Sequence, residues 1–372
     1  MRGLFDIPDD ITYLNCAYMS PQLNQVRAVG QQSVKRKSEP WKITAKDFFE
    51  DADVFRALCA QTLGASADGL ALVPSVSYGM ATAAANLSVG PGREILILAN
   101  QFPSNVYPWL ELAKVSQGIV RTVPRPVDDD WTRALLEEIN PQTAIVAVPN
   151  CHWTDGGLID LVRVSDCARS HRAALVVDAT QSLGVYPFDF ARIRPDFLVA
   201  ASYKWMFGPY SMGLLYVDEK HRQGTPIEFS WTGRRGSEQF SNLEYQAEYQ
   251  PGAQRFDVGE KGNFVSLPMA IEGMKQIQQW GVSSIQKSLR DFTSRIAKET
   301  QALGIQSIRS DLRAGHIIGL KMKPELLNES HRRLAEKKIF VSVRGTSIRV
   351  SPHLYNTEED ITRLVSVLST VT

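Results

Sequence analysis

The sequence has no long apolar run, almost no net charge and few cysteines, and each of these absences excludes a class of protein. Its 372 residues carry 41 basic and 40 acidic side chains, which leaves a net charge of +1. There is no basic run and no basic stripe interleaved with aromatics, so nucleic acid is not expected as the main partner. No apolar stretch has the length of a membrane-spanning helix, so we expect no membrane association. The four cysteines have no C-x-x-C spacing, which argues against a disulfide framework and against a metal site.

The beginning of the chain also lacks a targeting signal. The first residues, MRGLFDIPDDITYLN, have no charged start, apolar core or small-residue cleavage site, and we therefore expect a cytoplasmic protein. The composition, 44% hydrophobic and 22% charged, is that of an ordinary soluble globular chain. A chain of 372 residues is long enough for one large domain and a smaller one.

Two apolar runs in the middle of the sequence each end on a chemically active side chain. Residues 174–177 lead to Asp178, and residues 197–201 lead to the Ser-Tyr-Lys of residues 202–204. Neither run alternates with polar residues, which is typical of strands covered by helices on both faces, and open α/β sheets bind ligands beyond the strand ends. We therefore expect Asp178 and Lys204 to lie at one ligand site, although an Asp after a strand is also common as a helix cap.

A carboxylate and an amine at strand ends suit pyridoxal phosphate. A lysine amine forms a Schiff base with this cofactor, and a carboxylate beside the pyridine nitrogen keeps the ring protonated and electron-poor. The surrounding residues resemble the class V aminotransferases among the fold-type I pyridoxal-phosphate enzymes. The matching motif consists of residues 178–184 (DATQSLG), Asp196-Phe197, residues 202–204, Gly208-Pro209 and Gly213. Tyr203 departs from the His, Gln or Arg that usually precedes the lysine, and it is shared with kynureninases.

The resemblance implies an α/β fold, with a large domain built on a mainly parallel central sheet and a small C-terminal α+β domain. We expect an N-terminal segment of residues 1–20 that lines the site, a large cofactor-binding domain over residues 21–262, and the small domain over residues 263–372. In the N-terminal segment, the resemblance nominates Asn15 and Ala17 for the substrate side of the cofactor.

A candidate phosphate site lies in residues 70–81, which read as a short strand, a turn of small residues and an Ala-rich helix. Such a turn directs the free amide groups at Val76 and Ser77 toward an anion, with the Ser77 hydroxyl as a further donor. A Ser-x-Ser before a helix is also a common N-cap, so the pattern alone leaves both readings open. Similarity to the family's phosphate loop implies that Val76, Ser77 and, from the lysine motif, Ser202 hold the cofactor phosphate.

The same resemblance assigns roles around the cofactor ring. Phe102 is expected to stack on one face of the ring, while Thr154 and Gln181 are expected to hydrogen-bond near the pyridoxal hydroxyl. Because a phenyl ring cannot transfer protons, acid–base work moves to other groups, most simply to Lys204. His152 is either a substrate contact or a loop histidine with satisfied hydrogen bonds.

Residues 222–262 are polar and glycine-rich but carry many aromatic side chains, which argues against disorder. In relatives this region crosses a homodimer interface and contacts the partner's cofactor phosphate. We therefore expect a homodimer with three cross-subunit cofactor contacts: Trp231, Thr232 and Gly233. The neighbouring Arg234 and Arg235 bind the phosphate or a substrate carboxylate, or form a solvated pair of charges.

Arg349 matches the family's arginine for the substrate carboxylate, because a planar guanidinium can hold both oxygens of that group. Arg344 is either another candidate for this carboxylate or a surface residue. We therefore expect a pyridoxal-phosphate-dependent enzyme that acts on an amino acid, by amino transfer or by chemistry at Cα or Cβ. The alternatives are a lyase or epimerase of the kynureninase or isopenicillin-N-epimerase type, and a catalytically silent relative with a regulatory role. The absence of cysteine after Cys167 argues against a persulfide-forming desulfurase.

Overall fold

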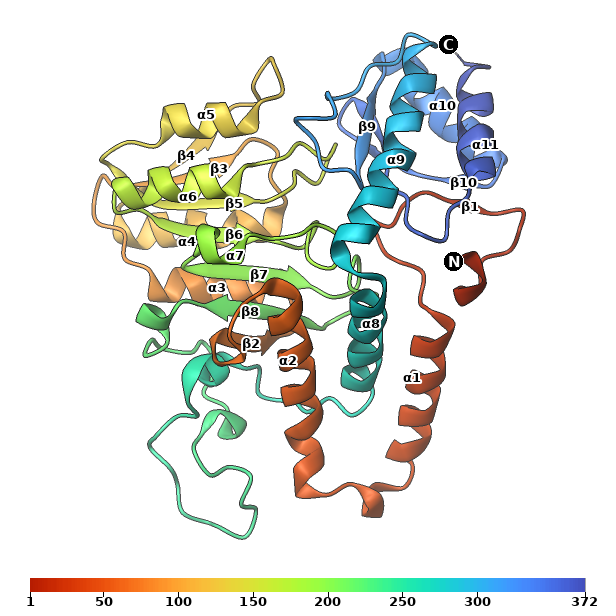
Figure 1. The fold of residues 1–372 in the computed structure, drawn as a ribbon. Helices are drawn as coiled ribbons and strands as arrows, with labels where there is room; N and C mark the ends of the chain where they lie inside the picture. The colour runs from red at the N-terminus through yellow and green to blue at the C-terminus, as the bar shows by residue number, and fades with distance from the viewer. Residues whose placement is uncertain (372) are drawn as a thin grey trace.

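A seven-stranded sheet forms the centre of the large domain in the computed structural model, which describes residues 1–371. Its strands are β2 (Leu70–Val73), β3 (Glu94–Leu98), β4 (Ile119–Val123), β5 (Thr143–Pro149), β6 (Ala174–Asp178), β7 (Phe197–Ala201) and β8 (Gly213–Val217). The strand order is β2-β8-β7-β6-β5-β3-β4, and only β8 runs antiparallel to its two neighbours. The expected α/β fold with a mainly parallel central sheet is confirmed (Figure 1).

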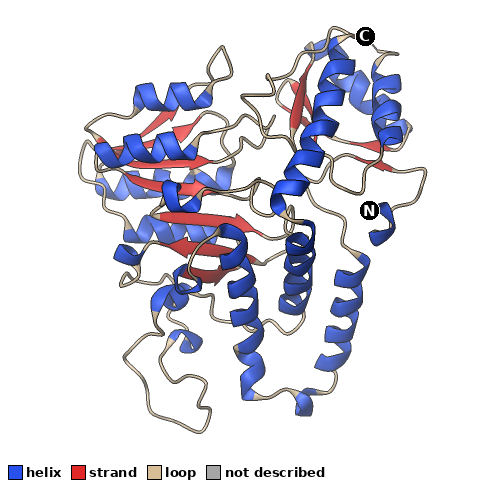
Figure 2. Ribbon diagram, viewed as in Figure 1, coloured by secondary structure: helices blue, strands red, loops and turns tan. Residues whose placement is uncertain are grey.

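Helices cover both faces of this sheet (Figure 2). One face packs against α3 (Val76–Asn86) and α4 (Tyr107–Ser116). The other face packs against α2 (Glu50–Leu63), α5 (Trp131–Glu138), α6 (Leu161–Ser170), α7 (Phe190–Ile193) and α8 (Ser266–Trp280). In β6, Val176 packs in the apolar core on the α3 and α4 side of the sheet, whereas Leu175 and Val177 pack in the core on the opposite side. Both faces of the strand are thus buried, which explains its unbroken apolar run.

The small domain is an α+β unit, as predicted. Its antiparallel sheet has the order β11-β12-β9 and consists of β9 (Ile318–Lys321), β11 (Ser342–Arg344) and β12 (Ser347–Val350). Its helices are α9 (Val282–Gln301), α10 (Pro324–Glu336) and α11 (Glu358–Leu368). Apolar side chains from the sheet and from all three helices form one core, which includes Ile296, Leu320, Leu334, Ile348 and Leu364.

The N-terminal segment joins the small domain before the chain enters the large one. β1 (Thr12–Tyr13) pairs in parallel with β10 (Ile339–Phe340), and Leu14 is buried in the small-domain core. The chain then continues into α1 (Asn24–Lys37), which packs against α8. The segment that precedes the large domain is therefore held next to β12 and the residues that follow it.

The connection between the domains is a break between two long helices. α8 packs against α1 and α2 of the large domain, and α9 begins after Gly281, whose φ of +77° ends α8. A left-handed residue at the end of a helix favours glycine because it has no Cβ. The predicted domain boundary between residues 262 and 263 lies just before α8 and stays a prediction.

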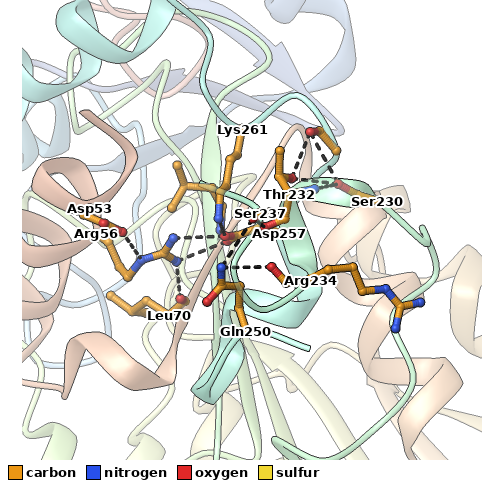
Figure 3. A network of polar contacts seen from close by, with 12 residues as sticks. Asp53, Arg56, Leu70, Ser230, Thr232, Arg234, Ser237, Gln250, Asp257 and Lys261 are labelled. Carbon is orange, nitrogen blue, oxygen red and sulfur yellow. Dashed lines mark hydrogen bonds and ion pairs between the residues drawn. The ribbon is translucent and has the colours of Figure 1, made fainter. Parts of the chain in front are cut away.

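A buried ion network holds the end of the segment 222–262 against α2 and β2 (Figure 3). The Asp257 carboxylate accepts hydrogen bonds from the Leu72 amide at 2.7 Å, from both Nη atoms of Arg56 at 3.1 and 3.0 Å, and from Lys261 Nζ at 2.9 Å. Burial opposes ionisation of Asp257, but Arg56 and Lys261 outweigh it and lower the pKa of the carboxyl group. The network therefore connects α2 and β2 to a segment about two hundred residues later in the chain.

Replacing Asp257 by Ala should lower the free energy of unfolding by about 3–5 kcal/mol, because two buried cations lose their counter-ion. Urea unfolding followed by circular dichroism measures this loss. Asp53→Ala is the matched control, since Asp53 lies 3.6 Å from Arg56 Nε but is 59% exposed, and its loss should stay below about 1 kcal/mol. Equal losses in the two variants would contradict the role given to the buried network.

Candidate functional site

The carboxyl ends of β6 and β7 place an acid and an amine at one cavity. β6 ends on Asp178, and Lys204 lies in the loop after β7, its parallel neighbour. Both side chains line a cavity of about 270 Å³. The cavity wall includes six of the residues predicted from the sequence: Val76, Ser77, Phe102, Asp178, Gln181 and Lys204. The structure therefore brings together the central pair, the candidate phosphate turn and the candidate stacking ring.

Lys204 has the properties of a nucleophilic amine. Its side chain is buried, with 5% of the residue exposed, and Nζ lies 5.4 Å from the ring centre of Phe102 and 5.3 Å from that of Tyr203. Burial and then the positive charge of Arg349 lower the pKa of the amine to about 8, although Asp178 acts in the opposite direction. A substantial share of the amine is therefore neutral when the pH is near this pKa, and only the neutral form attacks a carbonyl carbon.

Asp178 is a buried acid that suits a cationic partner. Its carboxylate accepts one hydrogen bond from the Thr180 amide at 3.0 Å. Burial raises the pKa of the carboxyl group, while Thr180 and Lys204 lower it in part. A positive charge at contact distance favours the ionised form of such a carboxyl group. A protonated pyridine nitrogen in the cavity would supply that charge.

The first turn of α3 forms the candidate phosphate end of the cavity. Ser75 caps the helix by accepting a hydrogen bond from the Tyr78 amide at 3.2 Å, and its hydroxyl lies 3.0 Å from that of Ser77. The amides of Val76 and Ser77 come too early in the helix to have an intrahelical acceptor. Both residues line the cavity. The N-cap is therefore present in this turn and leaves its first amides free, and phosphate binding by the turn stays a prediction.

Ser202 and Gln181 are engaged in contacts within the protein. The buried Ser202 hydroxyl donates to the Pro209 carbonyl at 3.1 Å, inside the loop that carries Lys204, and Ser202 is not part of the cavity wall. Gln181 donates to the Ala17 carbonyl at 3.1 Å and accepts from Trp205 Nε1 at 2.8 Å. Gln181 therefore joins the site to the N-terminal segment. Their predicted contacts with the cofactor remain predictions.

Asn15 and Ala17 lie where the N-terminal segment meets the small domain. Asn15 Oδ1 accepts a hydrogen bond from Ser342 at 2.8 Å, and the Ala17 amide donates to the Ser351 hydroxyl at 3.0 Å. Both residues are buried, and neither belongs to the cavity wall. They hold the segment beside β11 and β12, the strands that carry the two candidate substrate arginines.

His152 and Thr154 lie behind the cavity wall. His152 Nδ1 is 2.7 Å from the Thr154 hydroxyl, and Nε2 is 3.1 Å from the Ala99 carbonyl. Burial lowers the pKa of the imidazole to about 4, and the ring stacks on Trp131. This arrangement agrees with the alternative of a loop histidine with satisfied hydrogen bonds. Thr154 also accepts from Arg125 at 3.2 Å, and neither His152 nor Thr154 lines the cavity.

Trp153, which the sequence analysis did not single out, connects the cavity to the small domain. It lines the cavity, and its ring meets Phe102 edge-on at 5.4 Å. Its carbonyl accepts a hydrogen bond from Arg349 Nη1 at 2.7 Å. An aromatic residue in the loop after β5 was the available signal, but only the fold shows that this loop reaches β12.

Arg349 is a buried cation with free hydrogen-bonding capacity. The residue is 1% exposed, and its Nε and Nη2 atoms have no partner among residues 1–371. Burial and the charge of Arg344 lower the pKa of the guanidinium to about 9. A buried donor without a partner costs free energy, so an anionic ligand at these two nitrogens would stabilise the site.

The predicted cross-subunit residues lie in another part of the molecule. Trp231, Thr232 and Gly233 form a short helical turn, in which Thr232 donates to the Gly259 carbonyl at 3.1 Å. Figure 3 shows Thr232 near Asp257 and Lys261 of the ion network. None of the three lines the cavity of its own chain. Arg234 lies 3.9 Å from the Tyr249 ring centre, and the exposed Arg235 pairs with Glu248 at 2.6 Å. The pairing of Arg235 agrees with the alternative of a solvated charge.

No group of three or more His, Cys, Asp or Glu side chains within residues 1–371 is placed to hold a metal ion. No helix within the same range combines the length and the apolar character needed to cross a membrane.

Comparison with known proteins identifies the family. Residues 30–364 match the family model of the class V aminotransferases. The chain is 24% identical over 332 residues to the uncharacterised aminotransferase YcbU of Bacillus subtilis (strain 168), which covers 88% of this chain and 85% of that protein. It is 24% identical over 361 residues to the kynureninase of Geobacillus thermodenitrificans (strain NG80-2), with 90% and 82% covered.

A solved structure of a C-DES mutant, with glycine covalently linked to its pyridoxal-phosphate cofactor, has the same fold. The TM-score is 0.87 at 18% identity, and 100% of each chain is covered. Class V aminotransferases use pyridoxal phosphate, and the buried acid, the amine of lowered pKa and the free guanidinium nitrogens fit this cofactor and an amino acid. The chain belongs to the class V aminotransferase family and is a pyridoxal-phosphate-dependent enzyme.

Proposed function

We propose that the protein converts an amino acid with pyridoxal phosphate bound covalently to Lys204. Asp178 would pair with the ring nitrogen, Phe102 would stack on the ring, and the first turn of α3 would hold the phosphate. The observation that carries the proposal is the shared cavity of Asp178 and Lys204, at the ends of two neighbouring parallel strands. Arg349 holds the substrate α-carboxylate, which is supported by its two unpartnered nitrogen atoms.

Bound pyridoxal phosphate supplies an electron sink for negative charge that develops at the substrate Cα. Asp178 stabilises the positive ring nitrogen, and this pairing offsets the cost of burying its carboxylate. Once the substrate amine has displaced it from the cofactor, the free Lys204 amine would move the proton at Cα, because the neighbouring Phe102 has no titratable group and His152 lies behind the wall. The catalytically silent alternative is disfavoured, because the acid, the amine and the arginine are all present.

The reaction class is amino transfer, or elimination, cleavage or epimerisation at Cα or Cβ. A thiolate nucleophile is disfavoured by the positions of the cysteines. Cys151 borders the cavity from the end of β5, not from the small domain, and burial raises the pKa of its thiol. A thiol that stays protonated is a poor nucleophile. A cytoplasmic location stays a prediction from the sequence.

The proposal includes a homodimer in which Trp231, Thr232 and Gly233 contact the cofactor phosphate of the partner subunit. Two observations support it. These three residues do not reach the cavity of their own chain, and the loop that follows them exposes large apolar side chains, among them Leu243 at 90%. Exposed apolar side chains gathered in one segment are typical of an interaction surface, and twofold dimers are the commonest symmetric assembly.

Light scattering of the cofactor-loaded protein should give twice the chain mass of 41.5 kDa. Leu243→Asp should weaken this dimer, because it places a charge in the apolar contact, and should also loosen the cofactor. Val127→Asp is a control at another fully exposed apolar position, for which no change in mass is expected. A monomer with full cofactor occupancy would contradict the composite site.

Arg349→Lys should reduce the affinity for amino-acid substrates while cofactor binding changes little. Lysine keeps the charge but loses the planar fork, and one charge-assisted hydrogen bond contributes about 1.5–3 kcal/mol, or roughly ten- to a hundredfold in affinity. Titration of the absorbance of the loaded protein with amino acids measures the change, and product analysis then identifies the reaction.

The control for this titration is Arg309→Lys. The Arg309 side chain is 74% exposed and pairs with Asp311 at 3.1 Å, so its replacement should leave the titration unchanged. Unchanged amino-acid affinity in a well-folded Arg349→Lys protein would show that another group holds the carboxylate.

A further inference from the structure

We propose that Arg344 binds a second acidic group of the substrate, so that the enzyme acts on a short acidic amino acid of the aspartate or glutamate class. This inference rests on the proposed function, in which Arg349 holds the α-carboxylate. It goes further by assigning the side-chain end of the substrate to a second arginine, on the same face of the small-domain sheet.

The β11–β12 hairpin places the two arginines on one face. Arg349 is the cross-strand partner of Ser342, and Arg344 lies two residues beyond Ser342 on the same strand. Cross-strand partners, and residues two apart on a strand, point to the same side of a sheet. The two side chains are thus diagonal neighbours, whose Cβ atoms are typically about 7–8 Å apart in such pairs. Ser342, between them, donates to Asn15 and is therefore occupied.

Both arginines contact the same residue of the cavity wall. Arg349 donates to the Trp153 carbonyl at 2.7 Å, and the Arg344 guanidinium lies 5.3 Å from the centre of the Trp153 ring. Trp153 in turn meets Phe102 at 5.4 Å, and Lys204 Nζ lies 5.4 Å from the Phe102 ring. A continuous series of contacting residues therefore leads from the reactive amine to both guanidinium groups.

Neither arginine has an acidic partner in the part of the chain that the structure describes. No ion pair joins Arg344 or Arg349 to a carboxylate among residues 1–371. Arg344 Nη1 donates to the Val343 carbonyl at 2.7 Å, but its buried Nε has no partner, as is also true of Nε and Nη2 of Arg349. Five donors on a planar guanidinium suit bidentate binding of a carboxylate.

The basic side chains near the cavity outnumber the acidic ones, so a second anionic group on the ligand would be stabilised there. Lys204, Arg344 and Arg349 lie close enough that the positive charge of Arg344 lowers the pKa of both other groups. Among residues 1–371, Asp178 is the single carboxylic acid in the cavity wall, and the proposed function pairs it with the ring nitrogen. A substrate with one carboxylate compensates Arg349 only, whereas a dicarboxylic amino acid compensates both arginines.

The test compares acids with their neutral amides in the cofactor-loaded protein. Absorbance titrations with L-glutamate against L-glutamine, and with L-aspartate against L-asparagine, give two affinity ratios. In the unchanged protein the better acid should bind about tenfold or more tightly than its amide, as expected for a charge-assisted contact. In Arg344→Gln this ratio should fall to about one while the affinity for the amides stays the same. Arg309→Gln is the exposed-arginine control and should keep the full ratio.

A second measurement does not depend on the chemistry of the amine. Succinate carries two carboxylates and butyrate carries one, and neither has an amino group. Calorimetry should show tighter binding of succinate to the unchanged protein, and this preference should disappear in Arg344→Gln.

Three outcomes would overturn the inference: no preference for acids over amides in the unchanged protein, a preference that survives in Arg344→Gln, or an equal loss of acids and amides in that variant. The last outcome would mean that Arg344 only packs on Trp153 in the cavity wall. Failure of the proposed function is distinguishable, since no amino acid of any side-chain type would then change the absorbance of the loaded protein.

Discussion

The site depends on one constraint of the sheet, namely that neighbouring parallel strands end at the same edge. β6 and β7 are parallel neighbours, and this alone places Asp178 and the Lys204 loop at the same cavity. Both groups are buried, so their pKa values move toward the neutral forms, upward for the acid and down to about 8 for the amine. A cationic aromatic ring between them would reverse the shift of the acid and use the neutral amine. The fold therefore creates an electrostatic requirement that pyridoxal phosphate meets.

The substrate side of the site comes from a different part of the chain. Arg344 and Arg349 lie on the small-domain hairpin, and the N-terminal segment is held against that hairpin through Asn15 and Ala17. Gln181 of the large domain donates to Ala17, so the segment also contacts the cofactor side. Neither arginine lines the cavity itself, and the small domain reaches the cavity wall through their contacts with Trp153. α8 packs on the large domain and α9 on the small one, and the two helices meet at Gly281. The position of the hairpin relative to Lys204 therefore depends on how α8 and α9 pack.

The sequence predicted those features that depend on local pattern. Unbroken apolar runs predicted β6 and β7. The strand-end argument placed Asp178 and Lys204 together, and the resemblance added Phe102 at the same cavity. Contacts between distant segments could not be predicted in this way. Gln181 contacts Ala17, and Arg56 contacts Asp257, across more than a hundred positions of the chain. The contact of Gln181 with Trp205 depends on how the loop after β7 folds back. Trp153 was overlooked for the same reason.

Borohydride treatment of the cofactor-loaded protein, followed by peptide mass mapping, tests the central claim most directly. The reagent makes the bond between cofactor and amine permanent, and the account predicts a label on Lys204. Lys261 is an internal control, because it is equally buried but is paired with Asp257 at 2.9 Å and should stay unlabelled. A label on Lys261 or on another lysine, or the absence of any covalent label in protein that retains the cofactor, would contradict the account.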